Sequence, residues 1–300
     1  MSLAYEVEEE AFCSFCSRRL DLPWRNFIIP MALPAANPAV TSNLLSTQSA
    51  LITTLTSFLT VATHHILFLR RIYPPVSFLS TRAYNYPVRQ NRHPAVCEWV
   101  LSAIDAARDQ LEKGTVENVA LCIFECDNNE VLERWTFDLR ALPVVDHKEM
   151  DTVFESRSGD GGTGDRPQDT LKGKLNVADL EAQFRAVLSR LNSAAGKMKA
   201  LPEDREYSFT MTMEVREHAD RPVGRLGKEE RKWVAAEPEN WADNDDGGDI
   251  DDEASRRGRD GKTVPVRRLE AGELRMEVWV EESKAKFDLV ANGSQKVGSA

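Results

Sequence analysis

The sequence predicts a fold of the α+β class. Three long segments repeat apolar residues at the spacing of a single helical face: 44–73, 94–111 and 176–198. Two others, 207–217 and 274–281, alternate apolar and polar residues, which is typical of strands with one buried face. Segments 116–125 and 131–142 are predicted strands, and the cluster Asp127-Asn128-Asn129 between them favours a hairpin turn. Helices together with antiparallel hairpins indicate α+β rather than a parallel α/β sheet.

The segment from Leu44 to Tyr73 is the longest of these helices, and it carries no charge before Arg70. Its apolar residues follow the helical period, its Thr and Ser residues gather between them, and Pro74-Pro75 ends it. Residues 51–69 are long enough for a membrane span. A lipid-facing helix would be apolar on all sides, so the Thr-rich side and the pair His64-His65 favour the core helix of a soluble domain.

The ends of the other helices are marked by local signals. His93 precedes Pro94 at the expected first helical position, where proline is favoured, and is predicted to be a turn or cap residue. Lys113-Gly114 closes that helix. Asn176 is the predicted N-cap of the third helix, accepting a hydrogen bond from the backbone N–H of Asp179.

The formal net charge of −10 argues against a protein that grips nucleic acid over a broad surface. Five cysteines are too few and too irregular for a disulfide framework, which favours a reducing compartment. Cys13 and Cys16 have CxxC spacing without a second pair, so no zinc site is predicted. Residues 1–43 lack a period and form a predicted disordered extension, and Met31 is a possible alternative start.

Two polar insertions are expected, at about 146–173 and 218–262. The Gly-rich run 158–165 lacks both the preceding strand and the Gly-Lys-Ser/Thr ending of a phosphate loop. The acidic run 243–253 fails as a calcium loop, because Ala254 stands where a carboxylate should close the site. Both runs are therefore interpreted as solvated, flexible segments.

No catalytic motif is found: the sequence has no HExxH, no GxSxG and no nucleotide-binding fingerprint, and its five histidines are scattered. We therefore predict that the protein is not an enzyme and uses no cofactor and no metal. Trp279, on the otherwise charged face of segment 274–281, is compatible both with a binding surface and with cover by a neighbouring loop.

Several local strings, in this order along the chain, resemble a known family. They are 66–74 (ILFLRRIYP), 84–90 (YNYPVRQ), His93-Pro94, 111–119 (LEKGTVENV) and 276–282 (MEVWVEE). Together they resemble the HORMA domain, and in particular its branch that serves as the accessory subunit of DNA polymerase zeta. The resemblance covers residues 45–284, with the two insertions.

The resemblance implies three long helices packed on a mainly antiparallel sheet, and a C-terminal "safety belt" that closes over a partner peptide added to the sheet. The domain would span 44–284, the belt would run from about Trp233 to Glu282, and 285–300 would be a disordered tail. The residues that match the family's functional positions fall into three groups: Trp99, Trp233 and Ala235 for the partner peptide; Val264, Pro265, Glu277 and Trp279 for a second partner; and Arg185 for pairing with another HORMA domain. Relatives usually carry a larger apolar residue at the position of Ala235.

The function implied is that of a non-catalytic adaptor. It would clasp a peptide of the polymerase zeta catalytic subunit and bridge it to the C-terminal domain of a second translesion polymerase, with DNA touched only by its partners. The expected location is the nucleus, and also the cytoplasm. The alternatives are a spindle-checkpoint or meiotic HORMA adaptor, and a membrane-anchored protein with a span at 51–69.

Overall fold

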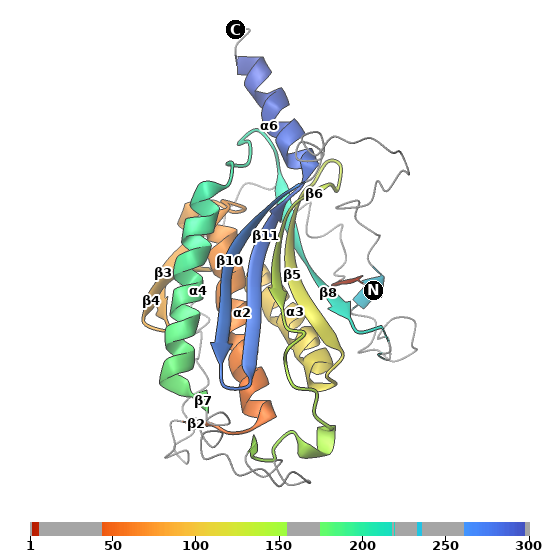
Figure 1. Ribbon diagram of the computed structural model, residues 1–300. Coiled ribbons are helices and arrows are strands. Elements are labelled where there is room, and N and C mark those ends of the chain that lie inside the picture. Colours follow the sequence, from red (N-terminus) through yellow and green to blue (C-terminus); the bar gives the residue numbers. More distant parts are fainter. Residues whose placement is uncertain are drawn as a thin grey trace, which may run out of the picture.

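A computed structural model of the protein describes residues 2–5, 44–154, 175–217, 219, 233–235 and 261–297. Its centre is a seven-stranded sheet in which every neighbouring pair is antiparallel (Figure 1). In spatial order its strands are β10 (Lys262–Ala271), β11 (Leu274–Glu282), β6 (Val131–Asp138), β5 (Val116–Glu125), β8 (Tyr207–Val215), β1 (Ser2–Tyr5) and β9 (Trp233–Ala235).

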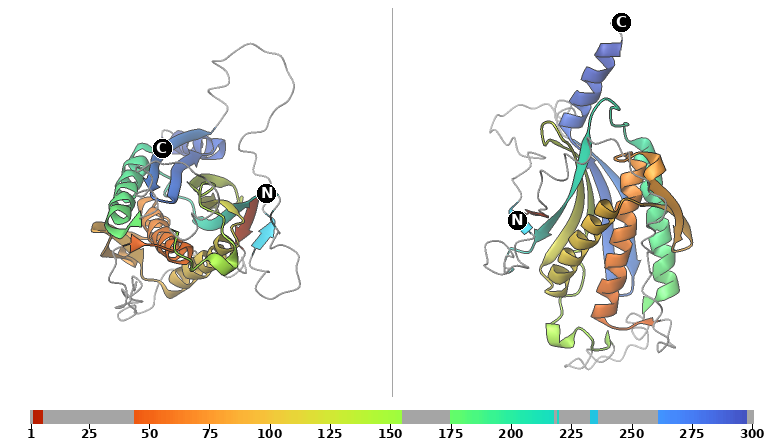
Figure 2. Two further views of the ribbon diagram at one scale, coloured as in Figure 1. Left: turned by 60° about the horizontal axis from the view of Figure 1, so that its bottom comes forward. Right: turned by 180° about the vertical axis from the view of Figure 1, so that it is seen from behind.

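Three long helices cover one face of this sheet, as the view from behind shows (Figure 2). They are α2 (Gln48–Leu69), α3 (Pro94–Glu112) and α4 (Val177–Lys197). A fourth helix, α6 (Lys284–Val297), follows β11 and extends beyond the end of the sheet (Figure 1). The smaller elements are the pair β2 (Leu44–Leu45) and β7 (Leu175–Asn176), the hairpin β3 (Phe78–Ala83) and β4 (Tyr86–Asn91), and the 3-10 turns η1 (Pro75–Ser77) and η2 (His147–Glu149). The α+β prediction is confirmed.

Helix α2 lies at the centre of the core. It is long and apolar enough to cross a membrane, but 78% of its most apolar window is buried inside the protein, which favours the core-helix interpretation. Its Thr-rich side, predicted to be the less apolar side, is partly buried as well: Thr56, Thr60 and Thr63 are at most 9% exposed. The hydroxyls of Thr56 and Thr60 donate to the backbone carbonyls of Ile52 and Thr56 one turn earlier, so they are satisfied within the helix.

The pair His64-His65 is also buried in α2, at 2% and 3% exposure. Burial lowers the pKa of His64 to about 4, and burial together with the charge of Arg89 lowers the pKa of His65 to about 4. Both imidazoles are therefore neutral at pH 7.

Most of the predicted element boundaries are confirmed. Pro94 opens α3, and His93 is its N-cap, with Nδ1 accepting from the N–H of Ala95 at 3.2 Å. Asn176 caps α4, as predicted. Its side chain accepts a hydrogen bond from the N–H of Ala178, so the predicted donor, the N–H of Asp179, was wrong. After Pro74, Pro75–Ser77 form the 3-10 turn η1, and strand β3 begins at Phe78.

The prediction of a disordered tail at 285–300 was wrong, because Lys284–Val297 form helix α6. The helix is held to the domain by the buried side chain of Lys286, described below, and by Ala285 and Leu289, which pack against the core. In the extension 1–43, Ser2–Tyr5 form strand β1; the CxxC pair lies outside the described residues. The insertion at 146–173 begins with η2 and is described to residue 154, while the Gly-rich run and the acidic run 243–253 lie outside the described residues.

Candidate functional site

The candidate site is the place in the sheet between β8 and β9, which we call the seat. Strand β1 fills it. Leu3 lies opposite Met213 on one side and opposite Ala235 on the other, and Ala4 lies opposite Thr212 and Val234. A segment in this position pairs antiparallel with a neighbour on each side, so the groups of its backbone find partners in the sheet whatever its side chains are. The seat is therefore built to hold an extended segment of chain.

The floor of the seat is the edge of β8, whose alternate residues face the helices. Phe209, Met211 and Met213 are all at most 2% exposed and belong to the core. Trp99 of α3 packs on Phe209, with the ring centroids 4.7 Å apart at 75°. Trp99 is 7% exposed, so it supports β8 from inside the core.

The outer wall of the seat is β9, which contains the other two residues expected there. Trp233 lies opposite Tyr5 and is 3% exposed, and Ala235 lies opposite Leu3. Trp233 and Ala235 thus line the seat directly, whereas Trp99 contacts β8 at Phe209, outside the residues of β8 that pair with β1.

β9 and β10 are the two opposite edges of the sheet, and residues 236–260 connect them. Six strand spacings amount to roughly 29 Å, whereas this connection can reach roughly 80 Å when extended. We call residues 233–282 the belt; its first strand closes the seat, and its last two strands, β10 and β11, pair with the far side of the sheet.

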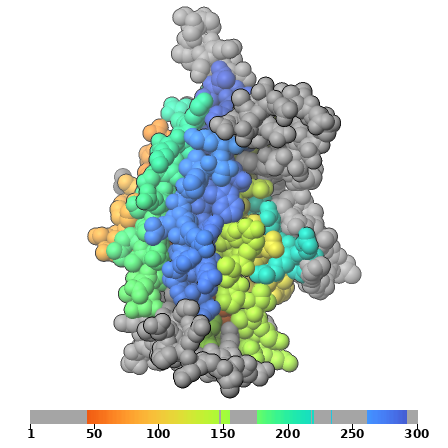
Figure 3. All heavy atoms as spheres, viewed as in Figure 1, coloured from red at the N-terminus to blue at the C-terminus, as the bar shows by residue number. Residues whose placement is uncertain are grey.

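Three of the four residues expected for a second partner share the sheet face that points away from the helices. Trp279 lies opposite Pro265 in the β10–β11 hairpin, and Glu277 lies two residues before Trp279 on the same strand. Glu277 and Pro265 are exposed and Trp279 is half-buried. Figure 3 shows the hairpin on the surface beside α4. Val264 is separated from them: it lies opposite the fully buried Val280 and packs against the core.

Arg185, the position expected to pair with another HORMA domain, lies on α4. Its Nε donates to the backbone carbonyl of Tyr84 at 2.9 Å, in the turn between β3 and β4. The side chain is half-buried, so this residue also fixes α4 to the hairpin.

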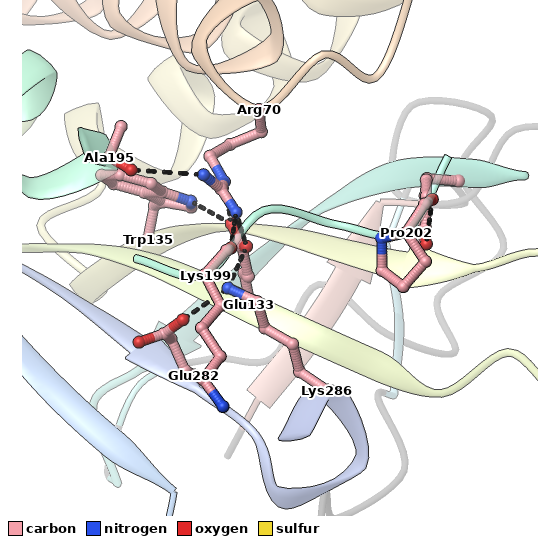
Figure 4. A network of polar contacts seen from close by, with 9 residues as sticks. Arg70, Glu133, Trp135, Ala195, Lys199, Pro202, Glu282 and Lys286 are labelled. Atoms are coloured by element: carbon pink, nitrogen blue, oxygen red, sulfur yellow. Dashed lines mark hydrogen bonds and ion pairs between the residues drawn. The ribbon is translucent and has the colours of Figure 1, made fainter. Parts of the chain in front are cut away.

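The far end of the belt is anchored by a buried ionic network that the sequence did not reveal (Figure 4). Glu133 of β6 accepts from Arg70 Nη2 at 2.6 Å and from Lys286 Nζ at 2.7 Å, and Lys286 also pairs with Glu282. Trp135 Nε1 donates to the other oxygen of Glu133 at 3.3 Å. The four charged residues cancel one another, and none is more than 6% exposed. One signal was available: Glu133 occupies a position of β6 that alternation assigns to the apolar face.

This network joins the belt to the body of the domain. Glu282 ends β11 and Lys286 lies in the first turn of α6, whereas Arg70 follows α2 and Glu133 lies in β6. Arg70 also donates to the carbonyls of Ala195 and Lys199 at the end of α4. No group of three or more His, Cys, Asp or Glu side chains that could hold a metal ion occurs among the residues described.

A family model for the HORMA domain matches residues 52–221, which is more than half of the chain. The chain belongs to the HORMA domain family. It is 28% identical to the DNA polymerase zeta processivity subunit of Schizosaccharomyces pombe, over 75% of this chain and 89% of that protein. It is 22% identical to the human mitotic spindle assembly checkpoint protein MAD2B, over 77% of this chain and 90% of that protein.

The fold is also found among solved structures. A chain in the crystal structure of the mitotic checkpoint complex superposes with a TM-score of 0.53 at 14% identity, covering 79% of this chain and 96% of that one. This likeness supports the same HORMA fold, and the predicted family and fold are confirmed.

Proposed function

We propose that this HORMA protein is a non-catalytic adaptor subunit of DNA polymerase zeta, which holds a peptide of the catalytic subunit in the seat. The observation that carries the proposal is the strand order: a strand distant in sequence from both neighbours lies between β8 and β9. Because β9 belongs to the belt, and the belt is anchored at the opposite edge, a peptide in the seat is enclosed and not merely added to an open edge. Its release would require the belt to open, so dissociation would be slow.

The identity of the partner rests on the relatives. Proteins named as polymerase zeta processivity subunits, from S. pombe and from Arabidopsis thaliana, match 75% and 63% of this chain. The exposed face that carries Pro265, Glu277 and Trp279 would contact the C-terminal domain of a second translesion polymerase. Arg185 would serve in pairing with another HORMA domain. Such a complex would act in translesion synthesis in the nucleus.

The charge of the chain agrees with a role between proteins. A net charge of −10 repels the phosphate backbone, so the polymerases and not this subunit would contact DNA. The residues of the seat recognise backbone and apolar groups, which is protein recognition and not chemistry on a substrate.

Two tryptophan variants, compared for the partners they retain, test the proposal. Full-length protein is mixed with fragments of the polymerase zeta catalytic subunit and with the C-terminal domain of a second translesion polymerase. Trp233→Ala removes the wall of the seat and is expected to abolish retention of the catalytic-subunit fragment. Trp279→Ala is expected to retain that fragment and to lose the second polymerase. Equal retention of both partners by both variants would refute the assignment of the two surfaces.

A second candidate function comes from the other relatives. The MAD2B proteins are named as spindle assembly checkpoint proteins, and the solved neighbour is part of the mitotic checkpoint complex. A spindle-checkpoint or meiotic HORMA adaptor would use the same seat for a different peptide. Failure of every polymerase zeta fragment to bind, with capture of a checkpoint or meiotic peptide that depends on Trp233, would establish this alternative.

A further inference from the structure

The seat of this protein is filled by its own N-terminus. We propose that Ser2–Tyr5 acts as a built-in occupant of the seat, in the same molecule, which a partner peptide must displace before it can bind. This rests on the proposed function only in its biological consequence, because the occupancy itself can be tested without any polymerase.

The register of β1 supports this role. On the side of β8, residues 2, 3 and 4 lie opposite Glu214, Met213 and Thr212. On the side of β9, residues 3, 4 and 5 lie opposite Ala235, Val234 and Trp233. The segment is antiparallel to both neighbours and closes the sheet between them, and β9 pairs with no strand other than β1 among the residues described. Without an occupant in the seat, β9 would lose its place in the sheet.

The register also indicates which type of residue a competing peptide needs opposite Met213. Directly opposite residues of an antiparallel pair lie on the same face of the sheet. Met213 is fully buried on the helix-covered face, and a competing peptide would place one residue opposite Met213, on that face. An apolar residue is expected there, and the sequence of β1 has leucine at this register position. A partner with an extended segment and an apolar residue at this position therefore matches the occupant it has to replace.

The length of β1 makes the occupancy reversible. Three residue pairs on each side hold it, whereas β5 and β8 pair along nine residues. Residues 6–43 join β1 to the rest of the domain in the same chain, so its binding is intramolecular and does not depend on protein concentration. A short segment held in this way can fill the seat, but yields to a longer peptide that makes more backbone hydrogen bonds and contacts.

Occupancy in the same molecule lowers the apparent affinity for a partner by the fraction of seats that are free. If the seat is filled in about 70–90% of molecules, removal of β1 raises partner affinity about 3- to 10-fold. The same removal would expose the edge of β8 in the unbound protein.

The first experiment uses the chain alone. Hydrogen exchange is compared between the full chain, a variant lacking residues 2–5, and Ala4→Pro, which removes a backbone donor from β1. Ser17→Pro, outside β1, is the matched control. Faster exchange at residues 211–215 and 233–235 in the first two variants, with β5 and β6 unchanged, supports the occupancy. If exchange at these residues is identical in all four proteins, the proposed occupancy is overturned.

The second experiment uses a fluorescent synthetic peptide of residues 1–10 as the probe. It should bind the variant lacking residues 2–5 and not the full chain, and unlabelled peptide should reverse the effect of the deletion on exchange. Absence of binding to the truncated variant would contradict the proposal. Dimers of the full chain that dissociate on removal of residues 2–5 would also contradict it, because the occupant would then come from a second copy.

A polymerase zeta fragment then separates this inference from the proposed function. Binding of the fragment that is about 3- to 10-fold tighter to the truncated variant than to the full chain is the expected result. Equal affinity would overturn the occupancy and leave the adaptor function standing. Failure of the fragment to bind either protein, with the self-peptide still bound, would overturn the polymerase assignment and leave the occupancy standing.

Discussion

Lys286 links helix α6 to the buried ionic network of the domain, and its replacement by methionine is a direct test of that network. Methionine keeps the length and most of the volume of the side chain and removes the charge. In Lys286→Met, Glu133 keeps its pair with Arg70, but Glu282 is left 1% exposed without the ammonium that neutralises it.

Removing one partner of a buried ion pair typically costs about 3–5 kcal/mol. Because Glu133 retains Arg70, we expect a loss near the lower end, about 3 kcal/mol, in the free energy of unfolding. A second substitution sharpens the test. In Lys286→Met with Glu282→Met, only the neutral pair of Arg70 and Glu133 remains, and buried pairs replaced by apolar residues are often neutral in stability. The double variant is therefore expected to regain at least about 2 kcal/mol over Lys286→Met.

The assay is urea unfolding of full-length protein followed by circular dichroism, with Lys284→Met as the matched control because that side chain is exposed. The control is expected to change stability by no more than about 0.5 kcal/mol. If Lys286→Met loses no more than this control, or if the double variant is less stable than Lys286→Met, the network does not anchor α6 and the reasoning is wrong.

Two further predictions concern stability. The pKa of His64 and that of His65 are each lowered from 6.5 to about 4 in the folded protein. As the pH falls, these histidines therefore become protonated near pH 6.5 in the unfolded chain, but only near pH 4 in the native state. Stability is therefore full above pH 6.5 and falls as the pH drops, by about 2 kcal/mol per histidine at pH 5; His64→Leu should flatten this decline in urea unfolding at pH 5 and 7, and an unchanged slope would contradict the assignment. Gly114 has φ +66°, and a Cβ there would approach Val144 Cγ1 to 2.7 Å, so Gly114→Ala should lose about 1–3 kcal/mol. Its control is Gly196→Ala in α4, where a Cβ would meet no atom within 4 Å beyond the helix's own neighbouring backbone, and helix propensity predicts a gain of up to about 1 kcal/mol. Thermal melts that show the same sign of change for both variants would refute the argument.

The elements that could be predicted from the sequence are those whose signals are local. The period of α2, the proline that opens α3, and the strict alternation in β8 each arise from residues within one element, and all three are where the pattern places them. Local signals do not show which distant residues meet: Trp99 of α3 packs on Phe209 of β8, and Trp233 lies opposite Tyr5 of β1.

The parts that could not be predicted depend on contacts between distant segments. Strand β1 has only four residues, and its strand state comes from the two neighbours that it joins. Helix α6 contacts distant segments: Lys286 meets Glu133 across 153 positions of sequence, and Leu289 packs against the core. Nothing in the charged composition around Lys286 distinguishes it from the exposed Lys284. Val264 and Pro265 are adjacent in sequence, so they lie on opposite faces of β10, and a surface assigned from sequence position alone cannot separate them.

The two ends of the belt are held by interactions of very different strength, and this decides how the seat can open. At one end, β9 pairs with β1 through three residues, and β1 is itself short. At the other end, β10 and β11 pair along nine residues, β11 pairs with β6 along six, and the chain then enters the buried network through Glu282 and Lys286. Opening at the second end would expose apolar core residues of the hairpin and separate buried charges, each step costing several kcal/mol. Opening at the first end would disturb only a short ladder, so exchange of the occupant would begin at β9 while the hairpin stays in place.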